Sequence, residues 1–345
     1  MPPTSPAAGA RNADAAEPSA AGWAELNDSV AELHSSRLGR PQPDVVTQLG
    51  FGAELARLVE AIGVWVDHAD QELRQLLEWQ FAGGSKFYRP LTIFSCYRAT
   101  RGGGPVPAAV LRAALAVELF HNMTLVVDDI LDESENRRSR PTLHVQFGRL
   151  PALMAAGYIV AEGFRIVEDA PQAIRLLSEL LARLGVAECL QWRLRRQPLD
   201  VEDWRKIAGE DTGSMFEICA CFGDPTERLR HFGHLLGVLY HGCDDVGDVR
   251  GGHALGGGGY EDLRDGILTL PAALAIKDPE VRAKFREPAE GDLQLMAQAF
   301  RDALPEADRY LDQIAEEAKQ EARLFAADPQ PLVALVDRTR QLALR

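Results

Sequence analysis

Asp128-Asp129-Ile130-Leu131-Asp132 is one of two aspartate-rich runs in this chain, and the second is Asp244-Asp245-Val246-Gly247-Asp248. Each run follows an apolar stretch with helical spacing, at residues 117–127 and 235–243. Residues i and i+4 share a face of a helix, so the first and last aspartates of each run are expected one turn apart. Carboxylates at this spacing repel each other when ionised, and two such runs at the ends of buried helices indicate a site that binds cations.

The residue types in the two runs favour magnesium. Hard carboxylate oxygens with no thiolate or imidazole beside them suit Mg²⁺, which takes few protein carboxylates and completes its octahedron with water and phosphate oxygens. The runs lie in different halves of the chain, so the fold must bring them together around a diphosphate. One run alone would be explained more simply as a solvated helix face. The candidate metal ligands are Asp128, Asp129, Asp132, Asp244, Asp245 and Asp248.

Composition limits the possible partners and the compartment. The chain has 345 residues, of which 46% are hydrophobic, and a formal net charge of −14. This charge argues against binding to nucleic acid or to anionic membrane surfaces. Five cysteines in apolar helical contexts are typical of reduced, packed thiols rather than a disulfide framework. We find no apolar run near transmembrane length and no leader segment, and we therefore expect a cytoplasmic protein without a transmembrane segment.

The spacing of apolar residues predicts an all-α fold. Residues 1–22 are rich in Ala, Pro, Ser and Gly and are predicted to form a disordered tail. Residues 23–345 show no internal linker, and we interpret them as a single large helical bundle with a central cleft. Segments with three- and four-residue apolar spacing lie at residues 52–80, 87–100, 107–127, 151–167, 171–192, 202–222, 225–243, 267–277, 290–301 and 307–326.

Further motifs surround the aspartate runs in a characteristic order. They are Gly84-Ser85-Lys86-Phe87-Tyr88-Arg89-Pro90, His121 before the first run, Arg137-Arg138-Ser139-Arg140-Pro141-Thr142, Phe147-Gly148, and Asp262-Leu263 with Gly266 and Thr269-Leu270-Pro271. With these motifs, residues 50–345 resemble the trans-isoprenyl diphosphate synthases, the polyprenyl synthetase family. The resemblance implies the isoprenoid synthase fold and a homodimer. It also implies an Mg²⁺-dependent enzyme that joins an allylic diphosphate to isopentenyl diphosphate.

The resemblance also implies roles for individual residues. Asp128, Asp132 and Asp244 are expected to be catalytic as direct ligands of magnesium, with Asp129 and Asp248 supporting them. Arg137 is expected to assist the departure of the allylic diphosphate, and Thr212 and His241 to lie on that donor side. The acceptor diphosphate is expected to bind Lys86, Arg89, His121 and Arg138.

The chain departs from the family pattern on the donor side. Asp211 stands where the family usually has lysine, His241 replaces a glutamine, and Gly258 and Ile267 occupy two further lysine positions. These changes remove cations that would hold the donor diphosphate. Three explanations are open: the donor could differ or be the sole substrate, Asp211 could recruit a magnesium ion, or replacement charge could come from Lys206, Arg250 or Arg264.

Two other functions share this fold, and the product length is a further question. A terpene cyclase would ionise a prenyl diphosphate and fold it on itself, and a regulatory subunit would modulate a partner synthase. The apparent acceptor site favours an elongating synthase over a cyclase, and the two intact aspartate runs argue against a regulatory subunit. Met123 and Thr124, just before the first run, are not large aromatic residues, whereas Phe120 is. By resemblance this favours a product of about C20–C25, with Phe120 as the floor of the product site.

Overall fold

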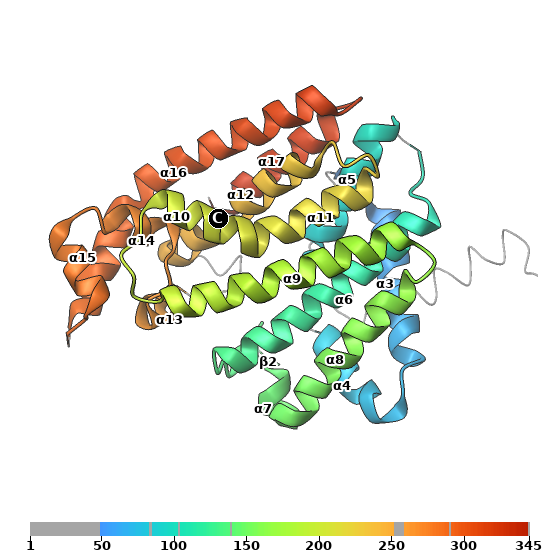
Figure 1. Cartoon of the computed structure of the whole chain (residues 1–345), viewed down its shortest axis with the longest axis horizontal. Helices are drawn as coiled ribbons and strands as arrows, with labels where there is room; N and C mark the ends of the chain where they lie inside the picture. The colour runs from blue at the N-terminus through green and yellow to red at the C-terminus, as the bar shows by residue number, and fades with distance from the viewer. Residues whose placement is uncertain are drawn as a thin grey trace, which may run out of the picture.

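The structure is a computed structural model that describes residues 49–82, 85–102, 104–138, 140–251, 259–289 and 291–343. The predicted tail at residues 1–22 and the departure at Gly258 lie outside these ranges. The described chain forms a helical bundle with one short hairpin, whose two strands have two residues each (Figure 1). The prediction of an all-α fold is therefore confirmed.

The elements follow one another along the chain. They are α3 (Gly52–Asp67), α4 (Gln71–Phe81), α5 (Tyr88–Arg101), α6 (Ala108–Leu131), β1 (Asn136–Arg137), β2 (Arg140–Pro141), α7 (Leu143–Phe147), α8 (Arg149–Ile166), α9 (Pro171–Leu194), α10 (Val201–Ala208), the π-helical turn η1 (Gly209–Gly213), α11 (Ser214–Gly223), α12 (Arg230–Arg250), α13 (Gly259–Asp265), α14 (Leu270–Ala275), α15 (Pro279–Arg286), α16 (Asp292–Phe325) and α17 (Gln330–Leu342).

The boundaries of several helices differ from the predicted segments. The segment 52–80 is two helices, because the Asp70 side chain accepts a hydrogen bond from the Glu72 N–H and begins α4. The segments 290–301 and 307–326 are one helix, α16, which continues through Pro305. Its apolar face stays in register across that proline, and its packing against α12 and α14 holds it despite the missing N–H. The last helix, α17, was not predicted.

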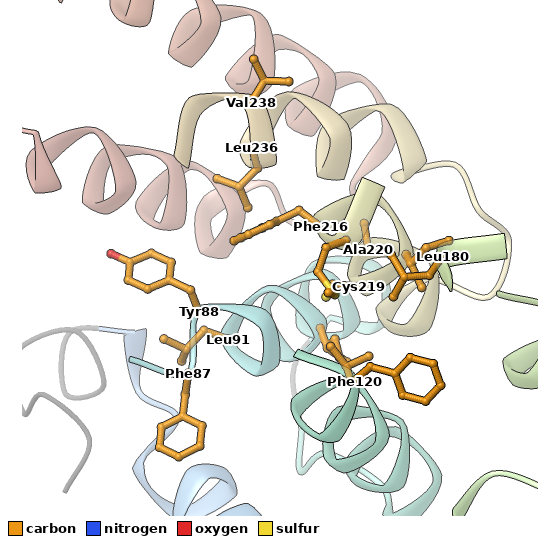
Figure 2. Packing of buried hydrophobic residues seen from close by; sticks show 14 of the residues in the cluster. Phe87, Tyr88, Leu91, Phe120, Leu180, Phe216, Cys219, Ala220, Leu236 and Val238 are labelled. Carbon is orange, nitrogen blue, oxygen red and sulfur yellow. The ribbon is translucent and has the colours of Figure 1, made fainter. Parts of the chain in front are cut away.

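The core is built from the helices that carry the aspartate runs and their neighbours. Side chains from α5, α6, α9, α11 and α12 gather in one apolar cluster (Figure 2). Phe216 of α11 lies 5.3 Å, ring to ring, from Tyr240 of α12, which in turn lies 5.1 Å from Tyr88 of α5. Gly237 allows α12 to approach η1 closely, since a Cβ there would lie 2.6 Å from the Gly213 Cα. Packing therefore fixes the second aspartate run against η1.

Helix α6 is longer and more apolar than the sequence suggested. It has 24 residues, and its mean hydropathy of 1.5 is high enough for a membrane span by length and composition. The statement that no run approaches transmembrane length is therefore wrong for this segment. However, 61% of its most apolar window is buried inside the fold. A core helix passes the same test, and α6 occupies that position between α5, α8 and α11.

A network of ion pairs joins α9, η1, α11 and α12. The Glu217 carboxylate of α11 forms ion pairs with Arg183 of α9 at 2.9 Å and with Arg230 of α12 at 2.5 Å. Arg183 also forms an ion pair with Glu210 of η1 at 2.9 Å. Burial alone would raise the pKa of Glu217, but hydrogen bonds from His234, Arg183 and Arg230 and the charge of Arg183 lower it to about 2. Because Glu210 precedes Asp211, the network also fixes the turn that carries Asp211.

We expect Glu217→Gln to lower the free energy of unfolding by about 3 kcal/mol at pH 7. The folded-state pKa lies below its ordinary value, so this contribution is fully present above about pH 4.5 and is lost as the pH falls towards 2. The difference in free energy of unfolding between wild type and variant, measured by urea unfolding, should therefore be smaller at pH 3 than at pH 7. Glu316→Gln is the control, because its pair with Lys319 is on the surface. A gap that stays constant with pH would contradict the assigned cause.

Candidate functional site

The two aspartate runs lie at the ends of two core helices, as predicted. Asp128 and Asp129 lie in the last turn of α6, Asp132 caps that helix, and the second run occupies the last two turns of α12. A chain of charges connects the runs. Asp211 of η1 raises the pKa of Asp128, and its carboxylate lies 3.3 Å from the His241 ring on α12. The fold thus brings the two halves of the chain to one site.

The six aspartates differ in their surroundings. Asp129 is 2% exposed and accepts a hydrogen bond from Arg137 Nε at 2.8 Å. Asp245 is 8% exposed, and its Oδ2 accepts hydrogen bonds from Trp204 Nε1 and from the Leu270 N–H, both at 2.8 Å. Asp245 thus links α12 to α10 and to the start of α14, and Asp129 holds Arg137. Asp128, Asp132 and Asp244 stay the predicted direct metal ligands, with Asp129 and Asp248 predicted to support them.

Carboxylates crowd both sides of the site. Burial and the charges of Glu188 and Asp211 raise the pKa of Asp128 well above its ordinary value. Burial and the charges of Asp248 and Asp245 raise the pKa of Asp244 to about 7. Two further carboxylates lie in the same fields, and burial together with neighbouring acids raises their pKa values. These are Glu188 of α9, to about 7, and Asp262 of α13, to about 8.

This donor set fits magnesium bound together with a diphosphate. Within the described ranges, no group of three or more His, Cys, Asp or Glu side chains stands ready to hold a metal ion by itself. Magnesium usually takes one or two carboxylates and completes its shell with water and substrate phosphates, so it does not need such a cage. The available groups are hard oxygens, and the strongly raised pKa values mark carboxylates that a cation would stabilise.

The predicted acceptor residues lie together. Burial lowers the pKa of Lys86 to about 8. The charges of Asp244 and Asp248 oppose this shift, and the charge of Arg138 adds to it. Burial and the charges of Arg89 and Arg138 hold the pKa of His121 well below its ordinary value, so the ring is neutral. His121 Nδ1 and Arg89 Nε are buried without a hydrogen-bond partner in the described structure. Buried polar atoms are normally satisfied, so these two indicate a ligand site.

Two small cavities lie beside these residues. One is lined by Ser85, Glu118 and Arg138, among others, and the other by Arg137 and Arg138 together with Asp129. Ser85, which replaces a glycine of the family pattern, donates a hydrogen bond to Glu118 Oε2 at 3.2 Å. Arg138 thus borders both cavities, with Arg137 beside it in the second.

The departures Asp211 and His241 form a pair. Asp211 Oδ2 lies 3.3 Å from His241 Nδ1 and accepts a hydrogen bond from the Thr212 hydroxyl at 3.1 Å, while His241 Nε2 lies 3.8 Å from Asp245 Oδ1. Burial would lower the pKa of His241, but Asp245 and the hydrogen bond with Asp211 raise it to about 9. Burial would raise the pKa of Asp211, but the His241 hydrogen bond and charge lower it. The acid is therefore neutralised by the histidine.

The three residues considered as sources of replacement charge each pair with another acid. Lys206 is 75% exposed and pairs with Asp203, Arg250 pairs with Asp308, and Arg264 pairs with Asp265. Besides Arg137, the first run is reached by Arg195, which follows α9 and whose Nη2 lies 2.8 Å from Asp132 Oδ1. Sequence reasoning missed Arg195 and Glu188 because neither belongs to a quoted motif. The one signal that the sequence offered for these two residues was a charged side chain next to an apolar helical segment.

Comparison with known proteins shows which family this chain is similar to. Residues 70–303 match the family model for polyprenyl synthetase. The chain is 29% identical over 322 residues to a nonaprenyl diphosphate synthase from Mycobacterium tuberculosis, covering 86% of this chain and 94% of the relative. It is 27% identical over 247 residues to a short chain isoprenyl diphosphate synthase from Methanocaldococcus jannaschii, covering 67% and 74%. A polyprenyl synthase from Caulobacter crescentus, crystallised with calcium and isoprenyl diphosphate, has the same fold, with a TM-score of 0.76, 24% identity, and coverage of 87% and 98%.

We expect His241→Gln to destabilise the fold by about 2–4 kcal/mol, because it leaves the Asp211 carboxylate without its charged partner. Asp211→Asn in the same chain should recover much of this loss, since an amide carries no charge to neutralise. Urea unfolding of the two single variants and the double variant gives the coupling energy. His231→Gln, at an exposed position on the same helix, is the control. Strictly additive effects would mean that the two residues do not act as a pair.

Proposed function

This chain belongs to the polyprenyl synthetase family and is a trans-prenyltransferase, and we propose that it condenses an allylic prenyl diphosphate with isopentenyl diphosphate in the presence of Mg²⁺. One observation carries the proposal. The ends of α6 and α12 meet at one site, and the charges of Asp244 and Asp248 act on Lys86 there. The nearness of Lys86, Arg89, His121 and Arg138 to one another supports an acceptor site beside the two runs. The isoprenyl diphosphate bound to the Caulobacter crescentus protein supports this class of substrate.

On the donor side, Asp128, Asp132 and Asp244 would hold magnesium, with Asp248 in support. Magnesium supplies charge neutralisation to the departing diphosphate. Arg137 adds a positive charge there, and its hydrogen bond to Asp129 keeps its side chain at the end of α6. His241 adds charge from α12, fixed in place by Asp211 and Thr212. Breaking of the bond between the allylic carbon and the diphosphate oxygen leaves an allylic cation.

On the acceptor side, Lys86, Arg89 and Arg138 would bind the diphosphate of isopentenyl diphosphate. A dianionic ligand would stabilise the charged form of Lys86, whose pKa burial has lowered. His121 is neutral and offers one ring N–H as a donor. The double bond of the acceptor then attacks the cation, a carbon–carbon bond forms, and a proton leaves to the released diphosphate. The apolar cluster under the site excludes water, which would otherwise capture the cation.

We propose a product of about C20–C25. Met123 and Thr124 leave no large aromatic side chain in the turn before Asp128. The Phe120 ring, one turn lower, is fully buried and packs edge-on against Phe164 of α8 at 5.3 Å. A Cβ at Gly163 would lie 2.5 Å from this ring, so the ring is held firmly. A floor formed by Phe120 would therefore be rigid.

We propose that the enzyme is a homodimer that uses the exposed apolar face of α7 and α8. Val145 of α7 is 50% exposed, and on α8 Leu150, Leu153 and Met154 are 69%, 44% and 58% exposed. Contiguous exposed apolar side chains usually mark an interaction surface. A second copy of the chain is the expected occupant. All five cysteines are free and four of them are buried, which supports the proposal of a cytoplasmic location.

Incubation with Mg²⁺ and farnesyl or geranylgeranyl diphosphate, with and without isopentenyl diphosphate, tests the activity. We expect longer prenyl diphosphates only when the acceptor is present. Asp128→Ala should lower the rate about 10²- to 10³-fold because the developing negative charge loses its stabilisation. Asp302→Ala, at an exposed site on α16, is the control. Hydrocarbons formed without the acceptor would identify a terpene cyclase, which the missing donor-side lysines would favour. No product in either condition would identify a regulatory subunit.

We expect Met154→Asp to shift the protein from dimer to monomer at micromolar concentration, because a buried unpaired charge at the interface is costly. Light scattering coupled to gel filtration measures the mass. Leu324→Asp is the matched control, since Leu324 is also exposed but lies on α16. A mass unaffected by Met154→Asp, or reduced equally by the control, would exclude α8 from the interface.

A further inference from the structure

Arg195 is placed to replace the cations that the donor side lacks. We propose that Arg195 binds the donor diphosphate and that Trp192 orients it, an inference that rests on the proposed function. Arg195 Nη2 lies 2.8 Å from Asp132 Oδ1, and its Cζ lies 4.4 Å from the centroid of the Trp192 ring. The side chain of Arg195 is 22% exposed, so it lies at the edge of the site and not on the open surface.

The surroundings of Arg195 are those of the first aspartate run. Burial and the charges of Asp211 and Asp132 raise the pKa of Glu188, and the positive charge of Arg195 opposes that rise. Glu188 in turn raises the pKa of Asp128. The charge of Arg195 therefore acts within the same group of carboxylates that is proposed to bind magnesium and, through it, the donor diphosphate.

The turn that carries Arg195 is fixed in position. The next residue, Arg196, has a left-handed backbone with φ of 61°, and its N–H donates to the Gly266 carbonyl at 2.9 Å. A Cβ at Gly266 would lie 2.4 Å from the Arg196 side chain, so the two segments are in close contact. The end of α9 is thus held against the segment between α13 and α14. Arg195 faces the first run from a defined backbone and loses little entropy when it binds a ligand.

Arg195 also has unused capacity for hydrogen bonding. Its Nε is buried and has no hydrogen-bond partner in the described structure, although Nη2 contacts Asp132. A guanidinium offers five donors in a planar fork that matches phosphate oxygens. When Asp132 binds a metal ion, the Arg195 guanidinium can release that carboxylate and bind the diphosphate instead.

Other cations cannot take this role equally well. Arg137 is held by Asp129 on one edge, and the charge of His241 is offset by Asp211. Lys206, Arg250 and Arg264 pair with acids elsewhere. Arg195 pairs with Asp132, a proposed direct ligand of magnesium, whereas Arg137 pairs with Asp129, which is proposed only to support that shell. We therefore assign to Arg195 the compensation for the lysine position that Asp211 occupies.

Steady-state kinetics and calorimetry test the proposal. Arg195→Ala should raise the KM for the allylic diphosphate about 10- to 100-fold and leave the KM for isopentenyl diphosphate within about 2-fold. Binding of inorganic pyrophosphate with Mg²⁺, measured by calorimetry, should weaken by a similar factor. Arg195→Lys should recover part of the loss by keeping the charge without the fork. Trp192→Ala should weaken binding about 2- to 5-fold through the lost cation–π contact.

Arg193→Ala is the matched control, because Arg193 is exposed in the last turn of α9, two residues before Arg195. Equal effects of Arg193→Ala and Arg195→Ala, or equal rises in both KM values, would overturn the proposal. A wild-type protein that binds magnesium pyrophosphate but does not elongate would contradict the proposed function alone. In that case pyrophosphate binding by the Arg195 variants still decides the role of this residue.

Discussion

Repulsion among buried carboxylates is the constraint on which this site depends. Both aspartate runs lie in the C-terminal turns of core helices, where the helix dipole already disfavours negative charge. Glu188 and Asp262 add further carboxylates to the same fields. The fold keeps this arrangement because α6 and α12 are anchored by apolar packing along most of their length. Core stability thus supports an electrostatic arrangement that only bound cations can relieve.

The basic groups are arranged around this acid in two different ways. The proposed acceptor cluster joins the cations Lys86, Arg89 and Arg138 to the neutral His121, and buried nitrogen atoms of Arg89 and His121 have no hydrogen-bond partner in the described structure. On the donor side, positive charge is paired with acid in advance: Arg137 with Asp129, Arg195 with Asp132, and His241 with Asp211. Under the proposed function, the donor diphosphate would compete with these acids for partners, whereas the acceptor diphosphate would meet buried nitrogen atoms that lack a partner in the described structure. This asymmetry matches the expected loss of lysines on the donor side.

Much of the fold and site was predictable because the decisive residues carry local patterns. The all-α fold followed from apolar spacing, and the joining of the two runs followed from their shared composition. Other features depend on packing that no local pattern encodes. Residues 290–301 and 307–326 were predicted as separate segments, yet the apolar face of α16 continues through Pro305 between them. Arg195 comes from the turn after α9, and only tertiary contacts place it beside Asp132. The positioning roles of Asp129 and Asp245 likewise emerge from hydrogen bonds with distant partners.

The π-helical turn η1 has a consequence for how this chain can diverge. A π turn contains one residue more than the α-helix it interrupts, and each residue turns a helix by about 100°. Deleting one residue from Gly209–Gly213 would rotate Asp211 away from His241 and Thr212. The contact between Asp211 and His241 therefore depends on the length of this turn as well as on the two residue types. A chain with an acid at this position needs both the π turn and a basic partner on the facing helix to neutralise it.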